Sequence, residues 1–361
     1  MPRSMDLRSA FPVFERVAYL NAGTNGPVPQ PAIDAGRERV ARELERGRGE
    51  RSHWESLIEL HERRRAALAG LLHCDPGEVA LTHSTTSGVN VVLSGLDLRP
   101  GDEVLTSDEE HPGLLAPLAG ARERAGITVR VAPFRSLADA VTDRTRLIAC
   151  SHVSWMNGQV VDAAALRETG VSVLLDGAQG LGAIPVDMNE LGCDYYAASG
   201  QKWLCGPDGS GCLYVSRARF GELRVPWFGF QNLETPNEPL ELRLHDDARR
   251  YDLSHVTGHS AAWALTAIEL LGAEGWDEVH QRAADLAGRL ADQLTERGLE
   301  VAPRGRTTLV TWRDPDCEER VAKMVEEGVV VRYLPGAGLV RASVGAWSSE
   351  EDLERLLALA V

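Results

Sequence analysis

Short apolar runs alternate with helical patterns through the middle of the chain, and this alternation constrains the fold more than any other feature. The runs are rich in Val, Leu, Ile and Ala, and helical segments separate several of them. Strands and helices that alternate at this spacing indicate an α/β sheet that is largely parallel. The predicted strands are 78–82, 103–106, 127–132, 146–150, 171–175, 194–198 and 211–216, and the predicted helices are 86–95, 113–125 and 163–168.

The C-terminal part of the chain has a different pattern. Helices are predicted for 261–271, 276–296, 318–327 and 349–357, with strands at 307–312, 329–333 and 339–344. Ser349, followed by two glutamates, is a suitable cap for the last helix. This mixture predicts a smaller α+β domain. We therefore expect an N-terminal segment of residues 1–21 that packs on the small domain, a large domain of residues 22–265 and a small domain of residues 266–361.

Only two of the 38 Lys and Arg residues are lysines, Lys202 and Lys323. A primary amine can lose its proton when it is desolvated and can attack a carbonyl, whereas a guanidinium remains charged. Lys323 lies in an amphipathic stretch and suits a surface position. Lys202 directly follows the predicted strand 194–198, in the sequence Ser-Gly-Gln-Lys-Trp, so it is the candidate for covalent chemistry.

Polar residues follow five of the predicted strands at their carboxyl ends, where open α/β sheets bind ligands. Each group also has a purely structural interpretation. Thr85 and Thr86 could do no more than cap a helix, His111 could be an ordinary loop residue, and Asp176 could cap a turn. The functional interpretation is a phosphate cradle at a helix N-terminus, an aromatic ring for stacking and a buried acid that requires a cationic partner. The groups are 83–88, 108–111, 151–155, 176–179 and 199–202.

A Schiff-base lysine combined with an acid for a pyridinium nitrogen is typical of pyridoxal phosphate (PLP) sites. The joint occurrence of phosphate cradle, stacking ring, buried acid and Lys202 therefore favours a PLP enzyme. In this interpretation Asp176 pairs with the pyridine nitrogen and Gln179 bonds to a ring hydroxyl.

Composition excludes several other classes of function. The net charge is −15, and the arginines are mixed with acids rather than arranged in a basic stripe, so nucleic acid is not an expected partner. No apolar run reaches the length of a membrane span. The six cysteines contain no CxxC pair, which argues against a zinc or disulfide framework and favours a reducing cytoplasm. We predict no metal site.

The order and wording of the motifs resemble the class V aminotransferase and cysteine desulfurase superfamily of fold-type I PLP enzymes. The resemblance extends from Tyr19-Leu20-Asn21-Ala22-Gly23 to the final helix. Within that superfamily, residues 108–113, 151–160 and 195–203 look most like the L-cysteine/cystine C–S lyase. The pair Arg332 and Arg341 also fits the spacing of that family.

The resemblance implies a role for each matching residue. Lys202 would hold the cofactor aldehyde and act as acid and base, Asp176 would pair with the pyridine nitrogen, and His111 would stack on the ring. Arg341 would bind the substrate α-carboxylate in a bidentate manner, and Arg332 would bind a second carboxylate. The other implied contacts come from Thr85, Thr86, Gln179, Ser199 and Gln201 to the cofactor and from Trp155 to the substrate.

The sequence departs from the superfamily at three places. Many relatives have His where this chain has Gln201. The segment expected to reach the phosphate of a neighbouring subunit is Ser254-His255-Val256-Thr257, with its Thr displaced. Desulfurases carry a nucleophilic Cys on the loop before the substrate arginine, and the loop 334–338 has none here. Cys205 is the one cysteine near Lys202, and we expect it to take no part in the reaction.

The first functional hypothesis is therefore β-elimination from cysteine or cystine, giving pyruvate, ammonia and a thiol or persulfide. The second is an aminotransferase or an epimerase-like PLP enzyme of secondary metabolism. The third, from another class, is a PLP-binding regulatory protein without turnover. Fold and cofactor alone do not separate these reactions.

The superfamily also implies a homodimer with the active site at the subunit interface. The apolar segment 225–230 is a candidate contact surface, because it is difficult to leave in water. The alternative is that this segment belongs to the core.

Overall fold

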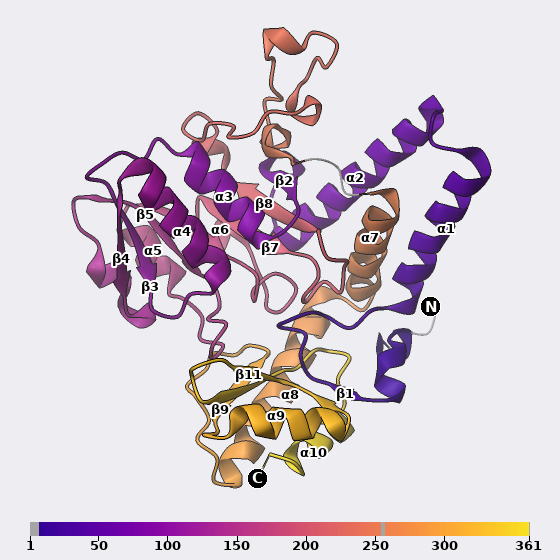
Figure 1. The fold of residues 1–361 in the computed structure, drawn as a ribbon, viewed down its shortest axis with the longest axis vertical. Helices are drawn as coiled ribbons and strands as arrows, with labels where there is room; N and C mark the ends of the chain where they lie inside the picture. The colour runs from indigo at the N-terminus through magenta and orange to yellow at the C-terminus, as the bar shows by residue number, and fades with distance from the viewer. Residues whose placement is uncertain (1–6, 254–256, 361) are drawn as a thin grey trace.

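The computed structural model describes residues 7–253 and 257–360. Figure 1 shows a larger lobe around a central sheet and a smaller lobe below it, with α8 extending between them. The helices are α1 (Gln30–Arg46), α2 (Arg51–Leu72), α3 (Thr85–Gly95), α4 (Pro112–Ala125), α5 (Ala163–Glu168), α6 (Met188–Leu191), α7 (Gly258–Ala273), α8 (Trp276–Glu296), α9 (Cys317–Glu326) and α10 (Glu350–Leu357).

The central sheet has seven strands in the order β2-β8-β7-β6-β5-β3-β4. Five of them, from β7 to β4, run parallel to one another, and β8 is antiparallel to both of its neighbours. The largely parallel α/β sheet predicted from the sequence is thereby confirmed. The strands are β2 (Val79–Thr82), β3 (Glu103–Ser107), β4 (Thr128–Ala132), β5 (Thr145–Ser151), β6 (Ser172–Asp176), β7 (Tyr195–Ser199) and β8 (Gly211–Val215).

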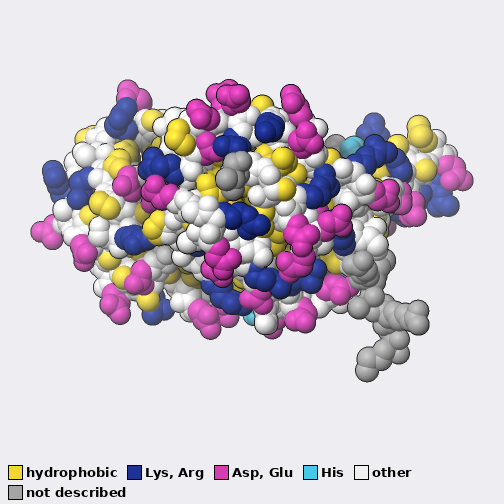
Figure 2. Space-filling model, turned by 90° about the horizontal axis from the view of Figure 1, so that it is seen from below, with side chains coloured by type: hydrophobic (Ala, Val, Ile, Leu, Met, Phe, Trp, Pro, Cys, Tyr) yellow, Lys and Arg dark blue, Asp and Glu magenta, His cyan; other side chains and the backbone are white. Residues whose placement is uncertain are grey.

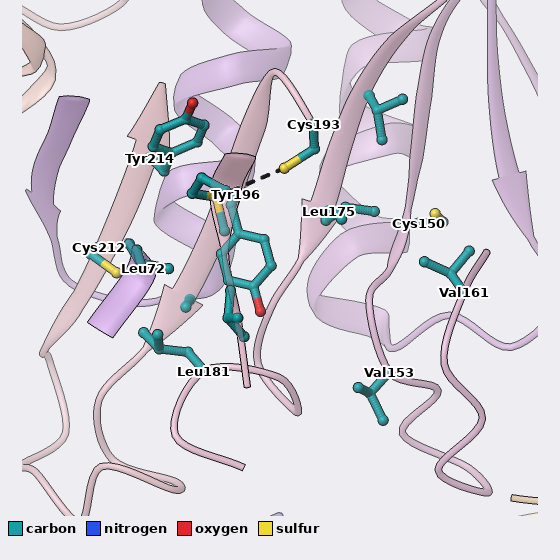
Figure 3. Packing of buried hydrophobic residues seen from close by; sticks show 14 of the residues in the cluster. Leu72, Cys150, Val153, Val161, Leu175, Leu181, Cys193, Tyr196, Cys212 and Tyr214 are labelled. Atoms are coloured by element: carbon teal, nitrogen blue, oxygen red, sulfur yellow. Dashed lines mark hydrogen bonds between the residues drawn. The ribbon is translucent and has the colours of Figure 1, made fainter. Parts of the chain in front are cut away.

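Apolar side chains fill both faces of this sheet, as expected when helices cover both sides. Neighbouring residues on one strand enter opposite cores: Leu175 lies in one cluster, and Leu174 lies in the other. Residues of α2 and α7 contribute to the first core, and residues of α3 and α4 contribute to the second. Figure 3 shows the first core, with Tyr196 at its centre.

The small lobe is an antiparallel sheet in the order β11-β12-β9, formed by β11 (Arg332–Leu334), β12 (Leu339–Ser343) and β9 (Leu309–Arg313). Its core includes apolar residues of α8, α9 and α10. Ser349 caps α10 through a capping box with Asp352, as predicted. The small α+β region predicted from the sequence is confirmed.

One strand prediction is wrong. Residues 329–333 do not form a single strand, because the chain changes partners at Val331. Val329–Val330 (β10) pairs in parallel with Ala18–Tyr19 (β1), and Arg332–Leu334 (β11) pairs with β12. The N-terminal segment thus contributes a strand to the small lobe. The exact division at residues 21 and 265 remains a prediction.

The surface mixes charges of both signs. Figure 2, which views the molecule from the side of the small lobe, shows basic and acidic side chains interspersed over that face. In the described part of the chain, no helix is both long and apolar enough to cross a membrane.

His280 on α8 makes the fold sensitive to acid. It is 5% exposed, it lies beside Trp276, and neither of its ring nitrogens has a hydrogen-bond partner within residues 7–253 and 257–360. Burial lowers the pKa of His280 to about 4, so the folded protein holds this ring neutral. The unfolded chain, in which the histidine pKa is near 6.5, binds the proton more tightly. The free energy of unfolding therefore falls as the pH falls from 6.5 toward 4.

We predict that His280→Leu reduces the loss of stability between pH 7 and pH 5. Between these two pH values the expected contribution is about 2 kcal/mol, because one pKa unit corresponds to about 1.4 kcal/mol and the full shift is lost only below pH 4. Thermal unfolding of both proteins at the two pH values measures the difference. An equal fall in the unfolding midpoint for both proteins would show that His280 does not cause the loss of stability at low pH.

Candidate active site

A cavity of about 260 Å³ lies at the carboxyl ends of the parallel strands. Larger hollows of about 650 and 710 Å³ lie beside α8, but neither contains any of the predicted site residues. The smaller cavity contains all of them. Its walls include Thr85, Thr86, His111, Trp155, Asp176, Gln179, Ser199, Gln201 and Lys202 from the large lobe, and Arg332 and Arg341 from the small one.

Asp176 ends β6 and is 5% exposed. Its side chain accepts a hydrogen bond from the backbone N–H of Ala178 at 2.9 Å, and no cation within the described residues forms an ion pair with it. Burial raises the pKa of Asp176, and the positive charge of Lys202 opposes that rise. A buried carboxylate with so little compensation is a strong site for a cationic ligand group.

Lys202 lies three residues beyond the end of β7, on a turn that is fixed from two sides. Gly26 N–H donates to the Gln201 carbonyl at 2.7 Å, and the Trp263 indole N–H donates to the Cys205 carbonyl at 2.9 Å. Burial lowers the pKa of Lys202 to about 8, helped by Arg341 and Arg332 and opposed by Asp176. Roughly a tenth of the amine is then unprotonated at pH 7, far more than for an ordinary lysine, and a nucleophilic lysine requires this free amine.

His111 begins α4 as its N-cap. Its Nδ1 accepts a hydrogen bond from Gly113 N–H at 3.0 Å, and its ring meets Trp155 edge to face, with 5.1 Å between the ring centroids. Burial lowers the pKa of His111 to about 4, and the charge of Lys202 contributes in the same direction. The ring is therefore neutral at pH 7 and suited to stacking.

The N-terminus of α3 forms another wall of the cavity. Ser84 caps the helix by accepting a hydrogen bond from Ser87 N–H at 3.1 Å. The cap is thus Ser84 rather than Thr85, and the Thr85 hydroxyl is buried without a partner in the described structure. The Thr86 hydroxyl donates to the Gly113 carbonyl at 3.1 Å. Free donors at a helix N-terminus favour an anion such as phosphate.

Gln179 lines the cavity, but both ends of its amide are engaged. The nitrogen donates to the Gly23 carbonyl at 2.8 Å, and the oxygen accepts from the Trp203 indole N–H at 2.9 Å. The predicted contact of Gln179 with a ring hydroxyl depends on the second lone pair of that oxygen, and it stays a prediction. The Gln201 side-chain oxygen has no partner in the described structure.

Arg332 and Arg341 are directly opposite each other on the antiparallel pair β11 and β12. Like charges in this arrangement repel each other, and no carboxylate in residues 7–253 and 257–360 forms an ion pair with either. Burial and the charge of Arg332 lower the pKa of Arg341 to about 9. The pair therefore forms a cationic wall that lacks an anion.

The sequence analysis missed Thr24, which contacts both guanidiniums. Its hydroxyl oxygen accepts from Arg332 at 3.2 Å and from Arg341 at 3.4 Å. Arg341 also donates to the Trp155 carbonyl at 2.7 Å. Thr24 directly follows the stretch Tyr19–Gly23 that carried the resemblance, and this position was the only available signal.

The predicted contact of the segment 254–257 with the phosphate of a neighbouring subunit cannot be located. Ser254, His255 and Val256 lie outside the described residues, and of that segment only Thr257 is described, as the residue before α7.

Four of the six cysteines are poorly placed for catalysis, because they are buried. Cys150, Cys193 and Cys212 lie among the apolar side chains of the core in Figure 3. Burial raises the pKa of Cys205 well above its ordinary value and that of Cys212 to about 12. A thiol with a raised pKa is a poor nucleophile at neutral pH.

Comparison with known proteins identifies the family. Residues 18–356 match the family "Aminotransferase class-V", and the chain belongs to that family. The fold-type I architecture expected from the sequence is thereby confirmed.

Two curated relatives cover almost the whole chain. The chain is 31% identical to isopenicillin N epimerase of Amycolatopsis lactamdurans over 94% of its own length and 93% of the relative. It is also 31% identical to a probable cysteine desulfurase of Pseudomonas aeruginosa over 96% of its length and 95% of the relative.

Two similar solved structures are of C-DES, a cystine C–S lyase. A C-DES variant with glycine covalently linked to its PLP cofactor superposes with a TM-score of 0.93 at 28% identity, covering 98% of each chain. The complex of C-DES with its product, cysteine persulfide, superposes with a TM-score of 0.92 at 28% identity, covering 97% of this chain and 99% of the other.

We predict that Arg332→Gln stabilises the protein without ligands and weakens its response to anions. Removing one of two opposed like charges should raise the free energy of unfolding by about 0.2–1 kcal/mol. Sodium sulfate should raise the midpoint of urea unfolding more for the unchanged protein than for the variant. Sodium chloride at equal ionic strength is the control, and an equal response to sulfate in both proteins would refute an anion site at this pair.

Proposed function

We propose that the protein is a PLP-dependent lyase that breaks the C–S bond of cystine or a similar amino acid by β-elimination. The observation that carries the proposal is the unpaired couple Arg332 and Arg341, which lies in the same cavity as Lys202. Two cationic groups that have no carboxylate partner among the described residues suit a substrate with two carboxylates, as cystine has. The similarity to the cystine C–S lyase C-DES supports the same conclusion.

The residues present fit PLP. The uncompensated carboxylate of Asp176 suits a protonated pyridine nitrogen, and the unpartnered Thr85 hydroxyl at the start of α3 suits a phosphate. The amine of Lys202 can hold the aldehyde carbon. We propose that His111 stacks on the ring, and that Thr86, Gln179, Ser199 and Gln201 provide further contacts to the cofactor.

Bound PLP supplies an electron sink that stabilises negative charge at the substrate Cα. Arg341 binds the α-carboxylate, Arg332 binds the distal one, and Trp155 borders the space between the arginines and His111. Lys202, as a free amine, would remove the proton from Cα. The electron pair left at Cα would expel the sulfur from Cβ as a thiolate or persulfide, Lys202 would return a proton, and water would hydrolyse the remaining three-carbon fragment to pyruvate and ammonia.

This reaction requires no protein thiol. The loop between β11 and β12, residues 335–338, contains no cysteine. The thiols of Cys205 and Cys212 are buried and have raised pKa values. Sulfur that leaves on the substrate fragment needs only the cofactor, Lys202 and the arginines, which favours a lyase over a desulfurase that carries sulfur on its own cysteine.

An epimerase or an aminotransferase is the second candidate. The 31% identity to isopenicillin N epimerase over 94% of the chain favours this alternative. It would use the same residues for binding and would move a proton at Cα without breaking a bond at Cβ. A PLP-binding protein without turnover is the third possibility, and the intact combination of Lys202 and Arg341 disfavours it.

We propose that the active unit is a homodimer that acts in the cytoplasm. Trp227, Phe228 and Phe230 are each more than half exposed, so the segment predicted as core or contact surface is not core. Leu240 is 98% exposed on the same loop region, which projects from the large lobe in Figure 1. Burial of these side chains against a second copy would remove an apolar patch from water.

We expect light scattering to give twice the mass of one chain. Trp227→Ser combined with Phe228→Ser should shift the protein toward monomers and lower its activity. A fully active monomer would contradict the dimer.

The function is tested by incubating the PLP-loaded protein with L-cystine and measuring pyruvate. Lys202→Arg is the control, because its guanidinium cannot condense with the aldehyde. Pyruvate without an oxo-acid acceptor is the predicted result. Racemised substrate without pyruvate would indicate an epimerase, and a requirement for an oxo acid would indicate an aminotransferase.

Arg332→Ala should impair the reaction of cystine more than that of cysteine. We predict that kcat/KM for cystine falls about 10- to 100-fold, the equivalent of one charged hydrogen-bond group worth about 1.5–3 kcal/mol. The fall for cysteine, which has a single carboxylate, should be much smaller. Equal losses for both would contradict the assignment of Arg332 to the distal carboxylate.

A further inference from the structure

Glu110 is a buried carboxylate that the proposed mechanism does not use. It is 6% exposed and lies in the segment between β3 and α4. The Ser107 hydroxyl donates to one of its oxygens, and the Ser151 hydroxyl donates to the other at 2.6 Å. The Ser151 backbone N–H donates to both oxygens, at 3.0 and 2.9 Å. Glu110 therefore connects the end of β3 to the end of β5.

This connection lies next to two groups of the site. Glu110 directly precedes His111, so its anchored backbone limits where His111 can move. Ser151 is the residue of β5 that is paired in register with Asp176 of β6. The following residue, His152, donates its backbone N–H to the Asp176 carbonyl at 2.9 Å. One side chain thus connects the segment that carries His111 to the strand beside Asp176.

Glu110 is held by hydrogen bonds and has no ion pair with any Lys, Arg or His within the described residues. The titratable groups that face it are Asp176 on β6 and the buried thiol of Cys150 on β5. Burial and the charge of Asp176 raise the pKa of Glu110 to about 7, while the hydrogen bonds from Ser107 and Ser151 oppose the rise. Its ionisation therefore falls within the pH range in which the enzyme would work.

We propose that Glu110 is a positioning residue for the cofactor, which fixes His111 through its bridge to Ser151 and adds a negative charge beside Asp176 when it ionises. The inference rests on the proposed function, because it concerns how the chain holds PLP. The two parts make separate predictions, since the bridge depends on hydrogen bonding and the second effect depends on charge.

Two substitutions separate the bridge from the charge. Glu110→Gln keeps an oxygen that can accept from Ser151 N–H and an amide that can bond to a serine hydroxyl, but it removes the charge. Glu110→Ala removes both. Glu109→Gln is the matched control, because Glu109 is the neighbouring acid and accepts from Asn157 at 3.0 Å without contacting Ser151.

The experiment measures PLP affinity, the circular dichroism of bound PLP and the pH dependence of its visible absorption. Unchanged protein and the three variants are compared well below their unfolding temperatures. PLP binding by the unchanged protein is established first, so that a failure of the proposed function is recognised before the variants are compared.

Glu110→Ala should bind PLP at least about tenfold more weakly, the equivalent of 1.4 kcal/mol, and should change the circular dichroism that reports ring orientation. Glu110→Gln should restore the dichroism. It should also move the midpoint of the absorption change to lower pH, because loss of a nearby anion lowers the pKa of cationic groups. Glu109→Gln should match the unchanged protein in every measurement.

Wild-type PLP affinity and dichroism in folded Glu110→Ala would overturn the positioning role and leave Glu110 a purely structural residue. An unchanged midpoint in Glu110→Gln would overturn the electrostatic part. A shift in Glu109→Gln equal to that in Glu110→Gln would show a general effect of surface charge and would overturn it as well.

Discussion

Charges of opposite sign surround one cavity without neutralising each other, and the proposed site depends on this constraint. Asp176 lies at one strand end and has no ion pair within the described part of the chain, and Arg341 is buried on another wall. Burial of a charge costs several kcal/mol unless a partner compensates it. Such charges are retained in a fold when a ligand supplies the missing partners. The charges of the cavity therefore indicate a ligand with a cationic group near Asp176 and anionic groups near the arginines.

The fold explains why these charges cannot pair with one another. Asp176 is fixed at the end of a parallel strand inside a sheet that is covered on both faces, and Arg332 and Arg341 are fixed on a separate antiparallel sheet. Lys202 lies on a turn held by hydrogen bonds from Gly26 and from the Trp263 side chain. Rigid elements thus hold the groups around the cavity, and this arrangement prepares the site before any ligand enters.

The large-lobe half of the site could be predicted from sequence, because parallel strands bring their carboxyl ends to one edge. Lys202, Asp176 and His111 each follow an apolar run, and their position needs only the strand pattern. The prediction of the arginine pair rested instead on a family resemblance, through the spacing of Arg332 and Arg341. Its cross-strand register could not be derived, because a hairpin register depends on the turn geometry.

The break at Val331 was missed because β10 pairs with a strand more than three hundred residues away in the chain. The long helices α1 and α2 were not assigned from the sequence.

The charge of Asp176 gives the most direct test of the account. If this carboxylate is uncompensated until a cofactor cation arrives, Asp176→Asn should raise the unfolding temperature of the protein without PLP. The same variant should bind PLP more weakly and lose about 10²-fold or more in turnover of cystine, as expected when an electrostatic element of a site is removed. Turnover and PLP affinity equal to those of the unchanged protein would contradict the central claim.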